Sequence, residues 1–154
     1  MRAFGKRYRI PLARGLKGED LDALVRAHPI DGTWSALEYA CHIRDVFEIQ
    51  RERLARALVE DDYTPPPMRR DDRVSELRYN EQDPLVVADD IAANATRLAT
   101  YVENFTEADL ARTMHYGYPE LALRPLSWVT QHTVHEGEHH LLDVGRVLRA
   151  ARGR

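Results

Sequence analysis

The residues best suited to chemistry are histidines and acids that gather near the end of the sequence, between Trp128 and Arg149. Four of the seven histidines lie there: His132, His135, His139 and His140. Residues four apart lie on the same face of a helix, which pairs His135 with His139 and Glu136 with His140. Imidazole and carboxylate groups are common ligands of first-row divalent metals. The segment is therefore predicted to be an amphipathic helix that carries a pair of metal ligands.

The apolar residues of this segment indicate which pair faces the interior. At about 100° per residue, the apolar side chains average to one direction: Val134, Leu141, Val144, Val147 and Leu148. Glu136 and His140 lie roughly 105° and 65° from that direction. His135 and His139 lie roughly 155° and 165° from it, provided that Gly137 and Gly145 do not bend the helix. Because a metal site in a bundle uses inward or flanking side chains, Glu136 and His140 are predicted as ligands, with His135 and His139 as supporting or solvated groups.

A third ligand must come from elsewhere in the chain. His42 lies in a long helical pattern among Tyr39, Val46 and Ile49. A lone histidine in such a setting is more often a packed imidazole than a ligand, and a histidine-rich helix is often a solvated surface. On these residues alone, a metal site and an ordinary helical surface both stay open.

Composition narrows the class of protein. The 154 residues are 44% hydrophobic and 31% charged, which is ordinary for one globular domain. A net charge of −3 gives no basic surface for nucleic acid, and no apolar run reaches the ~20 residues of a membrane helix. The basic N-terminus has no apolar core of a secretory signal, and the single cysteine, Cys41, excludes an internal disulfide. We expect a cytoplasmic protein with no nucleic-acid or membrane partner.

Periodicity predicts an all-α four-helix bundle of residues 18–154 that follows an N-terminal arm of residues 1–17. The helices are expected at 18–28, 34–60, 85–105 and 128–149. Ser35 and Glu38 have capping-box spacing, Pro84 begins the third helix, and Thr106 with Asp109 forms a local cap. Three prolines, Pro65 to Pro67, place a long extended crossover between the second and third helices.

A loop or small hairpin at 112–126 leads into the last helix. It carries His115, Tyr116, Tyr118 and Glu120. Such a loop is well placed to wall a pocket, so His115, Tyr116 and Tyr118 are pocket candidates. The alternative is a surface connection whose tyrosines pack on the bundle.

Three segments resemble the DinB-like family of metal-binding four-helix proteins: WSALEYACHIRDV, YNEQDP and HTVHEGEHHLLDVGRVLR. This family is related to the bacillithiol and mycothiol S-transferases and to the metal domain of mycothiol-dependent maleylpyruvate isomerase. The resemblance spans about residues 18–150. It implies a divalent metal, zinc or nickel, held by one histidine of the second helix and two ligands of the fourth.

Carried over residue by residue, the resemblance implies His42, Glu136 and His140 as ligands. Typical members have histidine where Glu136 stands, whereas the mycothiol-dependent isomerase resembles this His, Glu, His set. The neighbouring His135 and His139 leave a register shifted by one residue open. Asp143, about one turn after His140, is expected to support a ligand from outside the coordination shell.

The resemblance implies a metal-dependent thiol S-transferase acting in detoxification, because a thiol ionises on such a metal and becomes a nucleophile. Its partners would be a small-molecule thiol and an electrophilic substrate. The alternatives are a metal-dependent hydrolase, which activates water in the same way, and a non-catalytic metal-binding or dimerisation module. A homodimer fits this class of bundle. Cys41 is predicted to be a core residue rather than a nucleophile.

Overall fold

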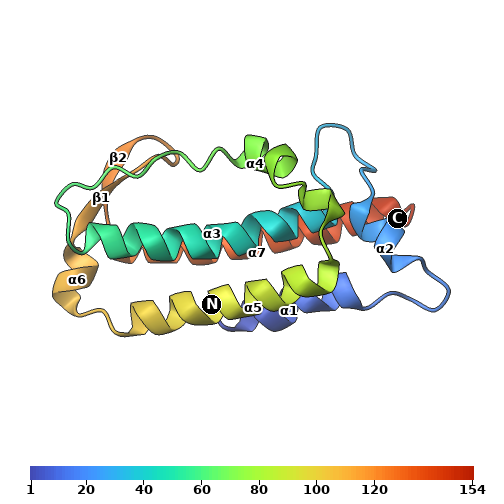
Figure 1. Ribbon diagram of the computed structural model, residues 1–154, viewed down its shortest axis with the longest axis horizontal. Coiled ribbons are helices and arrows are strands. Elements are labelled where there is room, and N and C mark those ends of the chain that lie inside the picture. The colour runs from blue at the N-terminus through green and yellow to red at the C-terminus, as the bar shows by residue number, and fades with distance from the viewer.

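The computed structural model describes residues 1–154 and contains a four-helix bundle, as the sequence predicts. The bundle helices are α1 (Ala3–Ala13), α3 (Ala36–Ala57), α5 (Pro84–Glu103) and α7 (Leu126–Ala151). Helix α3 packs on α5 and α7, and α1 packs on the same two helices from the other side. Figure 1 shows that α3 and α5 run in the same direction, and α7 runs opposite to α3. A parallel pair needs a connection that returns along the bundle, which explains the long crossover.

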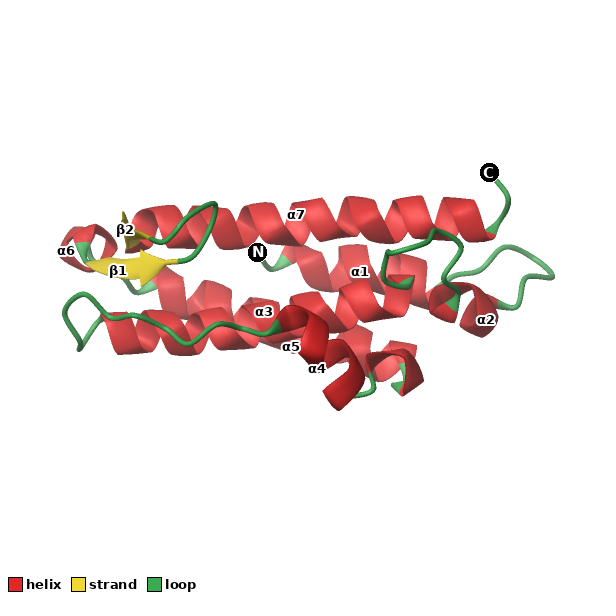
Figure 2. Cartoon of the chain, turned by 90° about the horizontal axis from the view of Figure 1, so that it is seen from above, coloured by secondary structure: helices red, strands yellow, loops and turns green.

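Short elements connect these helices. They are α2 (Leu21–Arg26), α4 (Arg70–Glu76), the 3₁₀ helix η1 (Tyr79–Glu81), α6 (Glu107–Ala111), β1 (Thr113–Tyr116) and β2 (Ala122–Pro125). The two strands form an antiparallel hairpin in which Thr113 pairs with Pro125 and Tyr116 with Ala122. Figure 2 shows the extended part of the crossover running along α3, with the hairpin beside the start of α7. None of the helices is long and apolar enough to cross a membrane.

The three helix starts predicted from capping residues and Pro84 are confirmed, whereas α7 begins at Leu126, two residues before the predicted start. The Ser35 side chain accepts from the backbone N–H of Glu38, and the Glu38 side chain accepts from that of Ser35. Asp83 caps α5 ahead of Pro84 in the first turn, and Thr106 forms the cap of α6. These contacts satisfy backbone donors that have no partner within the helix, so short-range sequence decides where the helices begin.

The N-terminal residues differ from the predicted arm, because residues 3–13 form α1, the first helix of the bundle. Phe4, Tyr8 and Leu12 recur at helical spacing and are buried in the core. The predicted helix at 18–28 shortens to the six residues of α2. Three arginines at or within α1 form ion pairs with acids of α5 and α7: Arg2 with Glu103, Arg7 with Glu138 and Arg9 with Asp89. The charges that suggested an arm are the outer face of an amphipathic helix.

Two glycines let α1 approach its neighbours closely. A Cβ on Gly5 would lie 2.6 Å from the Cβ of Ala92 in α5, and one on Gly137 would lie 2.6 Å from the Phe4 ring. Tyr8 also donates a 2.8 Å hydrogen bond to the carbonyl of Gly137. Helix α7 is continuous through Gly137, so this glycine serves packing rather than a bend.

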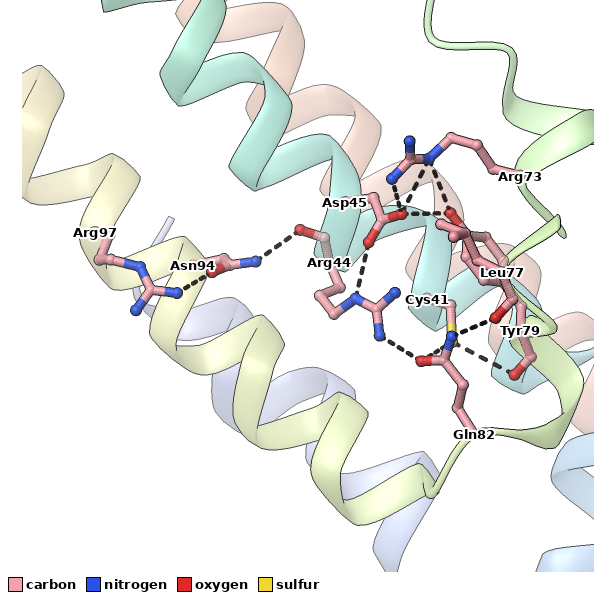
Figure 3. Close-up of polar contacts among 9 residues, drawn as sticks. All are labelled: Cys41, Arg44, Asp45, Arg73, Leu77, Tyr79, Gln82, Asn94 and Arg97. Atoms are coloured by element: carbon pink, nitrogen blue, oxygen red, sulfur yellow. Dashed lines mark hydrogen bonds and ion pairs between the residues drawn. The ribbon is translucent and has the colours of Figure 1, made fainter.

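A buried carboxylate fastens the crossover to α3. Figure 3 shows donors from three elements around Asp45. The Arg73 guanidinium of α4 lies 2.6 Å from Asp45 Oδ2, the Tyr79 hydroxyl donates to the same oxygen at 2.5 Å, and Arg44 Nε donates to Oδ1 at 2.8 Å. Together these bonds hold α4 and η1 against the middle of α3.

Candidate metal centre

Three donor groups from two helices converge inside the bundle: His42 of α3 with Glu136 and His140 of α7. One ligand atom of each lies within 4.8 Å of the others. His42 and His140 are 3% and 8% exposed, while Glu136 is partly buried. The i, i+4 spacing brings His140 Nε2 to 3.7 Å from Glu136 Oε2. This is the set that the sequence predicts.

Aromatic side chains enclose the imidazoles. The Trp34 ring lies 5.1 Å from that of His42, and the Tyr39 ring stacks on His140 at 5.4 Å. The two imidazoles meet edge to face at 4.9 Å. Because these rings exclude water from one side, the donors face a low-dielectric environment in which electrostatic interactions are strong.

Asp143 sets the orientation of His140. Its Oδ2 lies 3.0 Å from His140 Nδ1, and its Oδ1 pairs with Arg146 at 3.0 Å. Since a carboxylate only accepts, the proton of His140 lies on Nδ1 and the Nε2 lone pair faces Glu136. A carboxylate behind a histidine in this way is a common support of metal ligands.

Burial and neighbouring groups set the protonation states of His42 and Glu136 to forms that can bind a cation. Burial, together with the nearby His140, lowers the pKa of His42 to about 3, so His42 is neutral at physiological pH. Burial opposes ionisation of Glu136, but the neighbouring imidazoles of His140, His132 and His42 bring its pKa below the usual value. The site thus offers the neutral imidazole of His42 and the ionised carboxylate of Glu136.

This donor set fits a divalent metal. Two imidazoles and one carboxylate form a three-ligand set of the kind found in catalytic zinc sites. One buried ring nitrogen of His42, Nδ1, has no hydrogen-bond partner, and such a polar atom is rare in a folded protein. Three protein ligands also leave coordination positions open to a small molecule.

His135 and His139 lie outside the cluster, on the exposed face of α7. His139 joins a second close group with His140 and Asp143, and its Nε2 lies 3.5 Å from Asp143 Oδ2. That group reuses His140, and Asp143 is already bound by His140 and Arg146. We therefore favour the Glu136 and His140 register over the shifted one.

A cleft of about 940 Å³ opens onto the donors. It lies along α3 and α7, and it is bordered by residues 64–69, the start of α4 and the β1–β2 hairpin. The three pocket candidates of the hairpin, His115, Tyr116 and Tyr118, all line it. Tyr116 is buried and accepts a 2.6 Å hydrogen bond from Gln50, whereas Tyr118 is 56% exposed at the mouth.

The polar residues of this cleft that sequence reasoning missed include Gln50, Arg53 and His132. His132 stacks on Trp128 at 4.9 Å, and its Nε2 lies 3.6 Å from Glu136 Oε1. Its Nδ1 lies 3.3 Å from the Tyr116 hydroxyl. The sequence signal for His132 was its spacing: His132, Glu136 and His140 are each four residues apart, which places all three on one helix face.

Cys41 lies in the core, next to His42 in sequence but outside the cleft. Its Sγ is 3.7 Å from the Tyr79 carbonyl oxygen and 3.7 Å from Gln82 Oε1 (Figure 3). Burial raises the pKa of this thiol to about 12, so it stays protonated and is a poor nucleophile.

Comparison with known proteins identifies the class to which this fold and site belong. A family model described as the DinB superfamily matches residues 12–144, and the chain therefore belongs to the DinB superfamily.

Among solved structures, the chain is similar to YfiT from Bacillus subtilis, described as a probable metal-dependent hydrolase with an unusual four-helix bundle topology. The TM-score is 0.84 at 14% sequence identity, over 96% of this chain and 81% of that chain. The similarity shows a shared fold. No curated protein matches this chain.

Proposed function

We propose that this protein is a divalent-metal-dependent enzyme whose metal is held by His42, Glu136 and His140, and that it transfers a small-molecule thiol to an electrophile. The observation that carries the proposal is the convergence of three potential metal-binding side chains at one wall of the cleft. A divalent metal bound there would act as a Lewis acid that favours ionisation of a thiol or water.

The size of the cleft supports a reaction between two molecules. A volume of about 940 Å³ lies near the upper end for ligand sites and has room for a thiol beside an electrophile. Asp143 holds His140 in its ligating orientation. Tyr116, fixed by Gln50 and His132, supplies a polar contact within the cleft that can orient a substrate. The aromatic rings around His42 and His140 restrict the access of water.

Hydrolysis is the second candidate function. It is favoured by the similarity of the fold to YfiT, which is described as a probable metal-dependent hydrolase. The same three residues would hold the metal, and water would take the place of the thiol.

The test begins with elemental analysis of purified protein without a histidine tag, next to Glu136→Gln and His140→Ala. We expect about one equivalent of zinc or nickel in the wild type and much less in both variants. Loaded protein is then assayed with cysteine and an aryl chloride, and with p-nitrophenyl acetate.

Faster thiol conjugation that depends on the metal and is lost in both variants supports thiol transfer. Ester hydrolysis with no effect of cysteine favours the hydrolase instead. A protein that takes up no metal after reconstitution contradicts both and leaves a non-catalytic bundle.

A further inference from the structure

Arg53 is a cation of the cleft that has no acidic partner. Three arginines line the cleft: Arg53, Arg69 and Arg70. Arg69 pairs with Asp72 and Glu76, and Arg70 lies 3.6 Å from Asp71. Arg53 forms no ion pair, and its one hydrogen bond is from Nη2 to the Pro66 carbonyl at 2.6 Å. Its Nε and Nη1 donors are not used by the protein.

The electrostatic environment of Arg53 differs from that of the paired arginines. Burial lowers its pKa, and the neighbouring Tyr116 and Tyr63 only partly oppose this effect. Carboxylates instead raise the pKa of paired arginines such as Arg56 and Arg73. A guanidinium that is partly removed from water without a counter-charge costs free energy, which an anionic ligand would recover.

Helix geometry places Arg53 on the same face of α3 as the proposed ligand His42. The two are eleven residues apart, which at 100° per residue leaves a difference of about 20°. Along the axis the separation is about 16 Å, and both side chains line the same cleft. A small molecule that reaches from the metal donors along the cleft therefore meets the guanidinium with its far end.

We infer that Arg53 forms a carboxylate-binding subsite, and that the substrate is an elongated molecule with its reactive group at His42, Glu136 and His140 and a carboxylate at Arg53. Guanidinium N–H groups match the two oxygens of a carboxylate, so the unused donors of Arg53 suit this group. The position of the reactive end rests on the proposed function, whereas the subsite itself depends only on Arg53 and the cleft.

The test compares two ligands of equal length, mercaptohexanoate and the neutral mercaptohexanol, by calorimetric titration of zinc-loaded protein. We expect the acid to bind about tenfold more tightly, as for a charge-assisted hydrogen bond. In Arg53→Gln the preference falls to about one, with the affinity for the alcohol unchanged. Arg53 also holds the Pro66 carbonyl, so a displaced loop would change the affinity for both ligands; an unchanged affinity for the alcohol excludes that explanation.

Arg56→Gln is the matched control, because Arg56 is on the same helix, is exposed, pairs with Glu60 and does not line the cleft. It should retain the full preference for the acid. Equal binding of acid and alcohol to the wild type, or a preference that survives Arg53→Gln, overturns the inference.

A second readout separates this inference from the proposed function. In metal-free protein, hexanoate should shift the NMR signal of the Arg53 Nε–H group, and hexanol should not. If thiols bind no better than their sulfur-free analogues but hexanoate still shifts this signal, the proposed function fails and the subsite stands. If hexanoate leaves the signal unmoved, the subsite is wrong.

Discussion

His42 and Asp45 are three residues apart in α3, are each 3% exposed, and take part in two very different polar clusters. Both oxygens of Asp45 accept hydrogen bonds, from Arg44, Arg73 and Tyr79 (Figure 3). His42 instead has a buried ring nitrogen with no partner and faces Glu136 and His140. The Asp45 cluster is satisfied within the protein, whereas the His42 cluster gathers metal-binding groups and leaves one buried nitrogen without a partner.

The difference separates a structural role from a chemical one. Breaking a satisfied buried cluster leaves charges unpaired, so its residues are expected to affect stability. Removing a member of the unsatisfied cluster removes a ligand and little internal bonding, so its residues are expected to affect metal binding.

The largest effect is expected for His42→Ala. Loss of one of three protein ligands should reduce metal affinity by a factor of about 1,000 or more, while circular dichroism still shows a helical protein. Metal content and competition with a chelator measure the change. Metal binding at the wild-type level would show that the proposed ligand set is wrong.

Asp45→Asn is expected to destabilise the fold by about 3–5 kcal/mol, because Arg44 and Arg73 lose their common counter-charge. Urea unfolding of metal-free protein measures the loss. Asp72→Asn, which breaks only the exposed pair with Arg69, is the control and should cost about 1 kcal/mol or less. A loss at Asp45 no larger than that of the control would remove the contrast between the two clusters.

Acid should weaken the Asp45 cluster. Burial opposes ionisation of Asp45, but its bonds to Tyr79, Arg73 and Arg44 dominate and lower its pKa in the folded protein. A lowered carboxyl pKa stabilises the fold above the unfolded value of about 3.9, and that stability is lost as pH falls through the folded pKa. The stability of Asp45→Asn should therefore depend less on pH than that of the wild type below about pH 4. Parallel pH curves would argue against this linkage.

Asp143→Asn is expected to have an intermediate effect on the metal site. The amide can no longer act as the anionic acceptor for His140 Nδ1, and loss of such support commonly lowers metal affinity about 10- to 100-fold. Competitive titration with a chelator measures the change, and metal should still bind at saturation. A complete loss of binding would mean that Asp143 is itself a ligand.

His139→Ala should have the smallest effect, with a change in metal affinity below about threefold. His139 is exposed, and its Nε2 lies 3.5 Å from Asp143, farther than His140 and Arg146, which lie 3.0 Å from the same carboxylate. His140→Ala, one residue further, is the matched comparison and should abolish tight binding. Equal loss in the two variants would favour the group of His139, His140 and Asp143.

Predictions that depend on residues close in sequence agree with the structure. Capping pairs such as Ser35 with Glu38 act within one turn, so their spacing suffices to locate a helix start. The apolar stripe of α7 predicted that Glu136 and His140 face inward and His139 outward, which matches their burial. Periodicity suffices here because α7 is a continuous helix.

The prediction for the N-terminus failed because local signals there conflict. Basic residues, Gly5 and Pro11 all argue against a stable isolated helix, and residues 3–13 are too short to form one in water. Burial of Phe4, Tyr8 and Leu12 against the rest of the bundle supplies the missing stability. Only the folded partner surface makes this segment a helix.

By itself, the sequence determined the helical class, the capped starts of α3, α5 and α6, the family resemblance and which residues of the last helix face inward, because these features depend on residues close together in sequence. Only the tertiary structure decided that His42 meets Glu136 and His140, and that Arg53, Gln50 and His132 share a cleft with them. Contacts between α3 and α7 depend on how the crossover and the hairpin pack, and the free energy of that packing is spread over the whole core rather than carried by a local motif.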